Sequence, residues 1–446
     1  MDDVKTDENE ETRTDGRAGS GTAGRYFAYL LVVLVLVQIM DAYSTAYTAT
    51  FPSKIIEEFL PGLSPNEADA IMAISIGIAT TGMFFVFVNQ SLCDKLGRKA
   101  MLVLTTLGMA LSALLLTLSS NIWSYTFFLF LTYLFFSSDV WLIYVNEESA
   151  PEKRGAYSNL VMALGILGPV MIPLLRNRFI TDASPVGSWR GMSYFLVALG
   201  LPLSLVVALT VRETSKYLEV KARREGETGT GSHKPVNLRR NLSAILNSPR
   251  RTQVLVLLAM SFLLGFNYLF QQLGESYIQN NTALLERDVN NIITIIALTV
   301  IVGYLLTGFL ADRLGRVPLV HFFSVMMVLG ALMLFAGGKV PTKAGQFGLC
   351  AAGLATGYVS FNGLHIALRL VTVEIVPTER RGTGSGLRAF VQAVGVTTGF
   401  LLGSPLIRAW GLGVVFVAYA VPLLVNLVLT AKYVPETKGT DLSRVE

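Results

Sequence analysis

The chain has 446 residues, of which 52% are apolar and only 15% are charged, and its net charge is +5. Soluble globular proteins carry about 25% charged residues, so this composition excludes an ordinary soluble enzyme and indicates a membrane protein. Residues 1–25 contain seven acidic residues and no apolar core, which is not the pattern of a signal peptide. We expect them to form a disordered tail.

Twelve apolar runs follow the tail, each near the length of about 20 residues that a membrane-spanning helix needs. Backbone groups in hydrocarbon must be paired within their own segment, so each run is predicted to be a helix. The predicted helices cover residues 26–50, 69–92, 100–119, 122–146, 156–175, 190–211, 252–278, 291–311, 318–337, 345–372, 384–406 and 412–433.

The predicted fold is therefore an all-α membrane protein of two six-helix bundles, residues 26–211 and 252–433. The segment 212–251 between them carries ten Lys and Arg residues and is predicted to be a basic linker, and residues 434–446 form a second tail. Of the 36 Lys and Arg residues, 26 fall on the side of the two tails, 8 on the opposite side and 2 in the interior of helices, when residues at a helix end are counted with the nearest side. Because positive residues are retained on the cytoplasmic side, we expect both termini in the cytoplasm and the protein in the plasma membrane.

Three short motifs occur once in each half, in the same order. The paired segments are Asp94-Lys95-Leu96-Gly97-Arg98 with Asp312-Arg313-Leu314-Gly315-Arg316, Glu148-Ser149-Ala150-Pro151 with Glu374-Ile375-Val376-Pro377, and Val211-Arg212-Glu213-Thr214 with Val434-Pro435-Glu436-Thr437. The first residues of these pairs are 218, 226 and 223 positions apart by subtraction. This regularity indicates that the two bundles arose by duplication.

The doubled D-[RK]-x-G-R loop, after the second and eighth helices, resembles the signature of the major facilitator superfamily, and the resemblance covers the chain from Tyr26 onward. The ending Pro435-Glu436-Thr437 and the pair Gln271-Gln272 look like the branch that carries sugars and metabolites. Two departures weaken a narrower assignment. Gln90 replaces a glycine of the first loop motif, and the Gly-Pro-x-x-Trp segment of hexose carriers is absent.

The charged residues of the two loops are candidates for a gate, because ion pairs between loops can break and re-form as bundles rock. We expect them to latch the cytoplasmic side when the opposite side is open. The predicted gating residues are Asp94, Lys95, Gly97, Arg98, Glu148, Arg154, Asp312, Arg313, Gly315, Arg316, Glu374 and Arg381. The alternative is that the glycines make tight turns and the cations anchor the topology.

Ionisable and polar groups within the helices are functional candidates, because they are costly at membrane depth. Asp41, Asp139 and His365 are the predicted proton-coupling residues, and the repeat offset makes Asp139 and His365 symmetry mates. The polar residues fall at helical spacing on the first, fourth, seventh and tenth helices, which line the central cavity in the superfamily. The predicted substrate-binding residues are Gln38, Asn267, Gln271, Gln272, Asn362, Arg369 and Arg388. For Arg369 and Arg388, snorkelling to the membrane surface is the competing explanation.

The sequence contains no phosphate-binding loop, no nucleophile turn and no pair of histidines at metal-binding spacing. We therefore expect no enzyme, no cofactor and no metal. The favoured function is a monomeric secondary transporter that moves a small polar or anionic organic solute together with protons. The alternatives are a proton-coupled exporter of drugs or organic cations, a facilitative sugar uniporter, and a receptor on the same scaffold that binds without transport.

Overall fold

The computed structural model describes residues 8–85, 89, 92–93, 95–136, 140–150, 153–226, 242–245, 247–376 and 381–438. Within these ranges the side chains of 8–23, 136, 220, 223–226 and 381 are outside the description. The described chain is almost entirely helical, as the apolar runs predict. We call the side where α1 begins and α20 ends the terminus side, and the opposite side the far side.

The described part of the first bundle and the linker consists of α-helices and short 3-10 helices. These are α1 (Glu8–Ser44), η1 (Tyr47–Thr50), α2 (Pro52–Phe59), α3 (Pro65–Ala79), η2 (Thr80–Phe85), α5 (Arg98–Thr117), α6 (Ile122–Phe136), α7 (Val140–Glu148), α8 (Arg154–Gly165), α9 (Leu167–Phe179), η4 (Ser188–Ser193), α10 (Tyr194–Thr210) and α11 (Ser215–Gly226).

The second bundle follows the same plan. Its elements are α13 (Arg251–Phe266), α14 (Tyr268–Asn281), α15 (Glu286–Leu314), α16 (Arg316–Gly337), α17 (Lys343–Ile375), α18 (Arg381–Trp410), α19 (Leu412–Ala420), η6 (Val421–Leu424) and α20 (Val425–Tyr433). Eleven helical segments of the described chain are long and apolar enough to cross a membrane. The remaining predicted span, residues 345–372, lies in α17, a 33-residue helix that is rich in glycine and other small residues and packs against α16 and α15.

Three features differ from the expectations. Helix α1 begins at Glu8, within the range predicted to be a disordered tail. The linker contains helix α11, and the far-side loop after the first span contains the short helix α2. Several spans are also broken, and the break in the seventh falls at Asn267 between α13 and α14. Broken helices free backbone groups inside a bundle and are frequent at binding sites of transporters.

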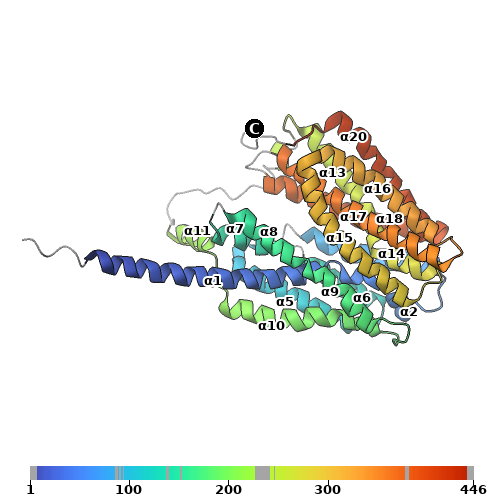
Figure 1. Cartoon of the computed structure of the whole chain (residues 1–446), viewed down its shortest axis with the longest axis horizontal. Coiled ribbons are helices and arrows are strands. Elements are labelled where there is room, and N and C mark those ends of the chain that lie inside the picture. Colours follow the sequence, from blue (N-terminus) through green and yellow to red (C-terminus); the bar gives the residue numbers. More distant parts are fainter. Residues whose placement is uncertain are drawn as a thin grey trace, which may run out of the picture.

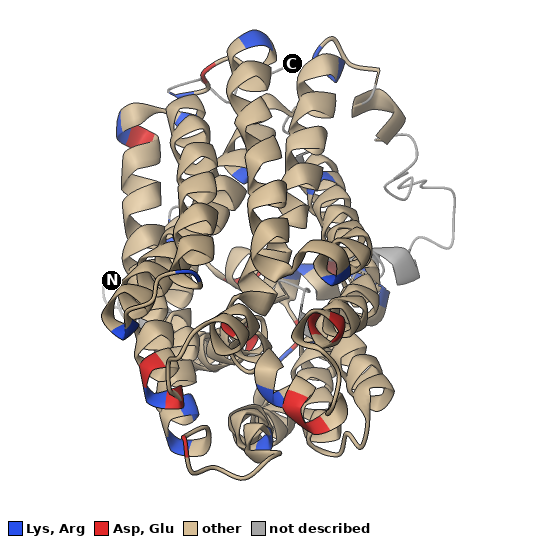
Figure 2. Ribbon diagram, turned by 90° about the vertical axis from the view of Figure 1, so that its right-hand side faces the viewer, with Lys and Arg blue, Asp and Glu red and all other residues tan. Residues whose placement is uncertain are grey.

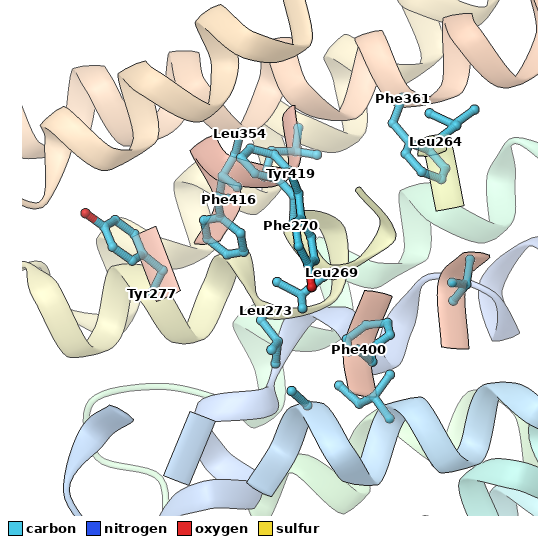
Figure 3. Close-up of a cluster of buried hydrophobic side chains, with 14 of the residues drawn as sticks. Leu264, Leu269, Phe270, Leu273, Tyr277, Leu354, Phe361, Phe400, Phe416 and Tyr419 are labelled. Atoms are coloured by element: carbon cyan, nitrogen blue, oxygen red, sulfur yellow. The ribbon is translucent and has the colours of Figure 1, made fainter. Parts of the chain in front are cut away.

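The two halves lie side by side, with α2, α14 and the start of α15 together at the far side (Figure 1). Charged positions gather mainly near helix ends, and most of the ribbon between them is uncharged (Figure 2). Aromatic side chains fill the core of the second half, where the Phe270 ring lies 5.1 Å from that of Phe416 and Tyr277 packs on the same ring (Figure 3). This core holds α14 against α19.

Glycines let specific helices approach closely. A Cβ at Gly77 of α3 would lie 2.9 Å from the Cβ of Phe400 on α18, so these two helices from different halves pack closely at this point. Within the second half, a Cβ at Gly395 would collide with the backbone carbonyl of Phe262, and one at Gly265 would lie 2.5 Å from the carbonyl oxygen of Gln392. Helices α13 and α18 therefore pack backbone to backbone.

Replacing Gly395 with Ala should separate α13 from α18 and lower the free energy of unfolding by about 1–3 kcal/mol, because the clash is with backbone that cannot rotate away. The matched control is Gly308→Ala on α15, where an added Cβ meets nothing within 4 Å and helix propensity predicts a gain of up to about 1 kcal/mol. Thermal unfolding of both purified variants measures the difference. Equal melting temperatures would show that the close packing is not needed.

Candidate functional site

On the terminus side of the first half, three sequence motifs meet in one cluster. The guanidinium of Arg98 donates to Glu147 at 3.1 Å and to the carbonyl oxygen of Cys93 at 3.1 Å. Glu213 accepts the backbone N–H of Arg98 at 2.9 Å and that of Lys99 at 3.2 Å. These N–H groups begin helix α5, where the helix dipole favours a negative charge.

The second half repeats this cluster. Arg316 donates to Glu374 at 2.8 Å, and Glu436 accepts the backbone N–H groups of Arg316 at 2.9 Å and Val317 at 3.0 Å. Burial alone would raise the pKa of Glu436, but these backbone hydrogen bonds outweigh it and lower the pKa. The carboxylate is therefore held in its charged form at the start of α16.

The glycines of the motif make this geometry possible. Gly97 and Gly315 have φ values of 102° and 101°, a region that side chains with a Cβ rarely adopt. A Cβ at Gly97 would also collide with Glu213, and one at Gly315 would lie 2.5 Å from the carboxylate of Glu436. The glycine is thus required both by the turn and by the approaching carboxylate.

One pairing differs from the sequence-based prediction. The alignment of repeats matched Glu148 with Glu374, but the residue that occupies the place of Glu374 is Glu147, because it is Glu147 that faces Arg98 and accepts the hydroxyl of Thr214. Glu148 lies one residue further round the helix and accepts the backbone N–H of Ser215 at 2.7 Å.

The other predicted gating residues lie around the two clusters. Arg154 donates a long hydrogen bond of 3.4 Å to the carbonyl oxygen of Ser149. The carbonyl oxygen of Lys95 accepts a hydrogen bond from the hydroxyl of Tyr217 at 3.0 Å. The guanidinium of Arg313 lies over the ring of Phe309. Asp312 is 3.5 Å from Arg316. Asp94 and the side chain of Arg381 lie outside the described part of the chain.

The two clusters are not joined to each other. In the described part of the chain, no hydrogen bond or ion pair links Arg98, Glu147 or Glu213 with Arg316, Glu374 or Glu436. On the terminus side each cluster therefore stabilises its own half.

On the far side, by contrast, a buried charge network joins the halves. Arg176 of α9 has no exposed surface and donates to Glu275 of α14 at 2.9 Å and to Glu286 of α15 at 3.2 Å. It also donates to Asn290 and, at 2.7 Å, to the carbonyl oxygen of Thr50. One guanidinium thus ties α9 to two helices of the other half.

The short helix α2 completes this network. Ser53 donates its backbone N–H and its hydroxyl to Glu275, at 3.1 Å and 2.6 Å, and Lys54 pairs with Glu286 at 2.8 Å. Burial would lower the pKa of Lys54, but its hydrogen bonds to Glu286 and Glu57 outweigh it, so the pKa is raised. Both carboxylates are therefore shared by cations and donors of the first half.

Two further contacts join the halves. Asp69, at 2% exposure, accepts the hydroxyl of Ser276 at 2.5 Å and the amide of Asn280 at 3.2 Å. Deeper in the bundle, the hydroxyls of Thr80 and Thr397 lie 2.9 Å apart. The structure is thus closed at the far side, whereas at the terminus side the described residues of the two loop clusters form no hydrogen bond or ion pair with each other.

Several predicted substrate-binding residues are buried in the interior. Gln271 and Gln272 of α14 are 7% and 3% exposed, and the Gln271 amide nitrogen has no described hydrogen-bond partner. Gln38 of α1 likewise has a buried amide oxygen without a described partner. Asn267, at the helix break, donates to the carbonyl oxygen of Tyr419 at 2.9 Å while its own side-chain oxygen has no described partner.

Tyrosines lie beside these amides. The hydroxyl of Tyr133 from the first half lies near that of Tyr268, which in turn lies near Gln272. Tyr358 donates to the backbone carbonyl of Gln271 at 2.6 Å. Asn362 accepts the hydroxyl of Tyr304 at 3.0 Å. Hydroxyl and amide groups with unused hydrogen-bonding capacity are suited to a polar solute.

The structure groups three other predicted residues between α17 and α18. The side-chain oxygen of Gln392 accepts a hydrogen bond from Nη1 of Arg388 at 2.8 Å and lies 3.0 Å from the Nδ1 atom of His365. Arg369 is close enough to Arg388 for the two positive charges to repel each other. Arg388 is only 2% exposed, so it does not snorkel. Asp41 lies half-buried on α1, and Asp139, the predicted mate of His365, lies outside the described residues.

Sequence reasoning missed the far-side network. Arg176 falls one residue beyond the predicted end of its span, and Glu286 lies before the predicted start of another, so both were assigned to loops. The sequence did contain one indication of the network, because a carboxylate within a membrane span, such as Glu275, is expected to pair with a cation. Gln392 was missed because a single glutamine in an apolar run carries no pattern of its own.

The sequence profile of the Major Facilitator Superfamily matches residues 24–280 and 269–444. The chain belongs to the major facilitator superfamily. It is 26% identical over 351 residues to the facilitated trehalose transporter Tret1 of Bombyx mori, covering 68% of this chain and 64% of that protein. It is 25% identical over 441 residues to the glucose transport protein of Synechocystis, covering 89% and 93%.

Among solved structures, the crystal structure of a D-xylose-proton symporter matches with a TM-score of 0.74 and 14% identity, over 93% of this chain and 99% of that one. This agreement confirms the two-bundle fold of a multi-pass membrane protein. The chain spans only 64% of the length of the silkworm trehalose transporter.

Replacing Glu147 with Gln should weaken the terminus-side cluster, because it removes the charge that Arg98 faces, whereas Glu148→Gln should leave the cluster in place. We expect Glu147→Gln alone to lower the melting temperature of the purified protein. A larger decrease in melting temperature for Glu148→Gln than for Glu147→Gln would contradict the pairing of Arg98 with Glu147.

Replacing Arg176 with Gln should open the far side, because it leaves two carboxylates buried without their shared cation. A cysteine placed at Thr50, in a chain whose Cys93 and Cys350 are replaced by Ala, should react several-fold faster with a membrane-impermeant maleimide added from the far side. The control is Arg178→Gln, two residues along α9 and exposed. Equal labelling rates in the Arg176→Gln and Arg178→Gln variants would show that Arg176 does not hold the far side closed.

Proposed function

We propose that this chain is a secondary transporter that carries a small polyhydroxylated solute across a membrane by alternating access. The terminus side is the cytoplasm, and the plasma membrane is the proposed location. The observation that carries the proposal is a set of three amides, Gln38 on the first half and Asn267 and Gln271 on the second, each with one buried nitrogen or oxygen atom that has no described hydrogen-bond partner. They lie between a far-side network that joins the halves and two terminus-side clusters whose described residues form no hydrogen bond or ion pair with each other.

The solute class follows from the chemistry of these groups. Amides and hydroxyls both donate and accept hydrogen bonds, so they match the hydroxyl groups of a sugar or polyol. The named relatives support this class, since two of those similar to the chain are called trehalose and glucose transporters. The proposed substrate site comprises Gln38, Asn267, Gln271, Gln272 and Asn362.

Movement between states follows from the two kinds of contact. The described conformation is held by the bonds of Arg176, Glu275 and Glu286. We propose that in the opposite conformation these bonds break and the loop clusters of Arg98 and Arg316 approach each other and latch the cytoplasmic side. Because each cluster is already assembled within its half, the halves move as rigid bodies.

Proton coupling is the finer part of the proposal. Asp41, Asp139 and His365 are the proposed carriers, because ionisable groups at membrane depth are costly and are retained for function. The competing function is a facilitative uniporter, which the similarity to the facilitated trehalose transporter of Bombyx mori favours.

In proteoliposomes, we expect counterflow of radiolabelled glucose, xylose or trehalose by the wild-type protein. Gln271→Ala should lower the rate by about 5- to 150-fold, since a buried hydrogen-bonding group that contacts the solute is worth roughly 1–3 kcal/mol. Asn281→Ala, at the exposed end of the same helix and outside the proposed substrate site, is the control.

The same vesicles distinguish symport from uniport. Symport predicts accumulation above the outside concentration only under an inward proton gradient, and Asp41→Asn should abolish accumulation while sparing counterflow. Accumulation that survives Asp41→Asn would remove Asp41 from the coupling, and loss of all flux in every condition with intact folding would overturn the transport function itself.

A further inference from the structure

Arg388 is buried at membrane depth with little to hold its charge. It lies seven residues after Arg381, the first residue of α18, or about 10 Å along the helix. Its exposure is 2%. Its one described hydrogen bond runs from Nη1 to the side-chain oxygen of Gln392, which is a neutral group. Nε is buried without a described partner.

Two other arginines, the fully buried Arg176 and the partly exposed Arg190, have their hydrogen-bonding groups well satisfied. Arg176 donates to two carboxylates, an amide oxygen and a backbone carbonyl. Arg190 donates to Glu58 and to the carbonyl oxygens of Thr117 and Ser119. The fold therefore provides acceptors where an arginine has a structural role, and Arg388 is the exception among these three.

The surroundings add positive charge. Arg369 of α17 is near enough to Arg388 to repel it, and both arginines act on His365. Among the described residues, no carboxylate forms an ion pair with Arg369, Arg388 or His365. A buried cation without a counterion is destabilising, so the cluster lacks a negative group.

The orientation of the guanidinium indicates what that group is. Nη1 is anchored by Gln392, which lies one turn further along the same helix and also faces His365. The opposite edge, formed by Nε and Nη2, makes no described hydrogen bond. Two parallel N–H groups on one edge of an arginine are the arrangement that binds the two oxygens of a carboxylate or phosphate.

We propose that Arg388, supported by Arg369, binds the anionic group of the transported solute, which makes the substrate a polyhydroxylated acid or a sugar phosphate and not a neutral sugar. This rests on the proposed function, since it adds a charged end to a solute whose hydroxyl groups are bound by the amides. An anionic lipid headgroup has the same chemistry and is distinguished by the experiment.

The test measures ligand-induced thermal stabilisation of the purified full chain in a detergent with a neutral headgroup, at constant ionic strength. The probes are gluconate, glucuronate and glucose 6-phosphate, with glucose and xylose as neutral counterparts. We expect at least one anionic probe to bind wild-type protein, and Arg388→Gln to weaken it by about 10- to 100-fold, as loss of a charge-assisted hydrogen bond predicts. Arg388→Lys should retain part of the affinity.

Arg408→Gln is the control, because Arg408 is an exposed arginine near the other end of the same helix and should leave anion affinity unchanged. Phosphatidylglycerol is added as a separate probe and should give no shift that depends on Arg388. If it does, the site belongs to a lipid and the solute proposal is wrong. If no anionic probe stabilises wild-type protein more than Arg388→Gln, the proposal is likewise wrong.

Flux measurements separate this proposal from the transport function. Wild-type vesicles that move neutral sugars but neither bind nor move the anions would overturn the anionic site and leave transport intact. Anion binding that depends on Arg388, without flux of any probe, would leave the site intact and overturn transport.

Discussion

The absence of water in the hydrocarbon core is the constraint on which this structure depends. Every polar group placed there must find its partner within the protein, and a charge at mid-depth costs about 2.5–3.5 kcal/mol on insertion scales. The chain meets this cost in two ways. Arg176 is surrounded by acceptors from both halves, whereas Gln38, Gln271 and Arg388 retain donors or acceptors without described partners.

This contrast distinguishes the residues that stabilise a conformation, such as Arg176, from the residues that are proposed to bind a ligand. The bonds of Arg176 with Glu275 and Glu286 cross between the halves, so they stabilise one arrangement of the halves against another. The described hydrogen bonds of the loop clusters of Arg98 and Arg316 lie within one half each, so each cluster makes its own half rigid. A rocking motion then needs only the far-side bonds to break, and solute binding supplies the interactions that compensate.

The repeats explain why the two loop clusters are so alike. Glu213 and Glu436 occupy the same position in the third repeated motif, and each caps the helix that follows the glycine of the first motif. The glycine, the arginine and the two carboxylates thus form one unit that was duplicated with the bundle. The sequence motifs aligned Glu148 with Glu374, but the structural counterpart of Glu374 is Glu147. The two acids are adjacent, and the rotation of the helix decides which of them faces Arg98.

The sequence by itself determined the helical spans, the doubled architecture and the family, because hydrocarbon thickness and backbone pairing leave one solution for an apolar run. It also identified most of the interior polar residues, including Gln271, Arg388 and His365, since such residues stand out in apolar segments. Only the tertiary structure decided which of them meet. The partners of Arg176 come from helices about 100 residues away in the chain, and the choice of Glu147 over Glu148 depends on helix rotation, which no periodicity of the sequence specifies.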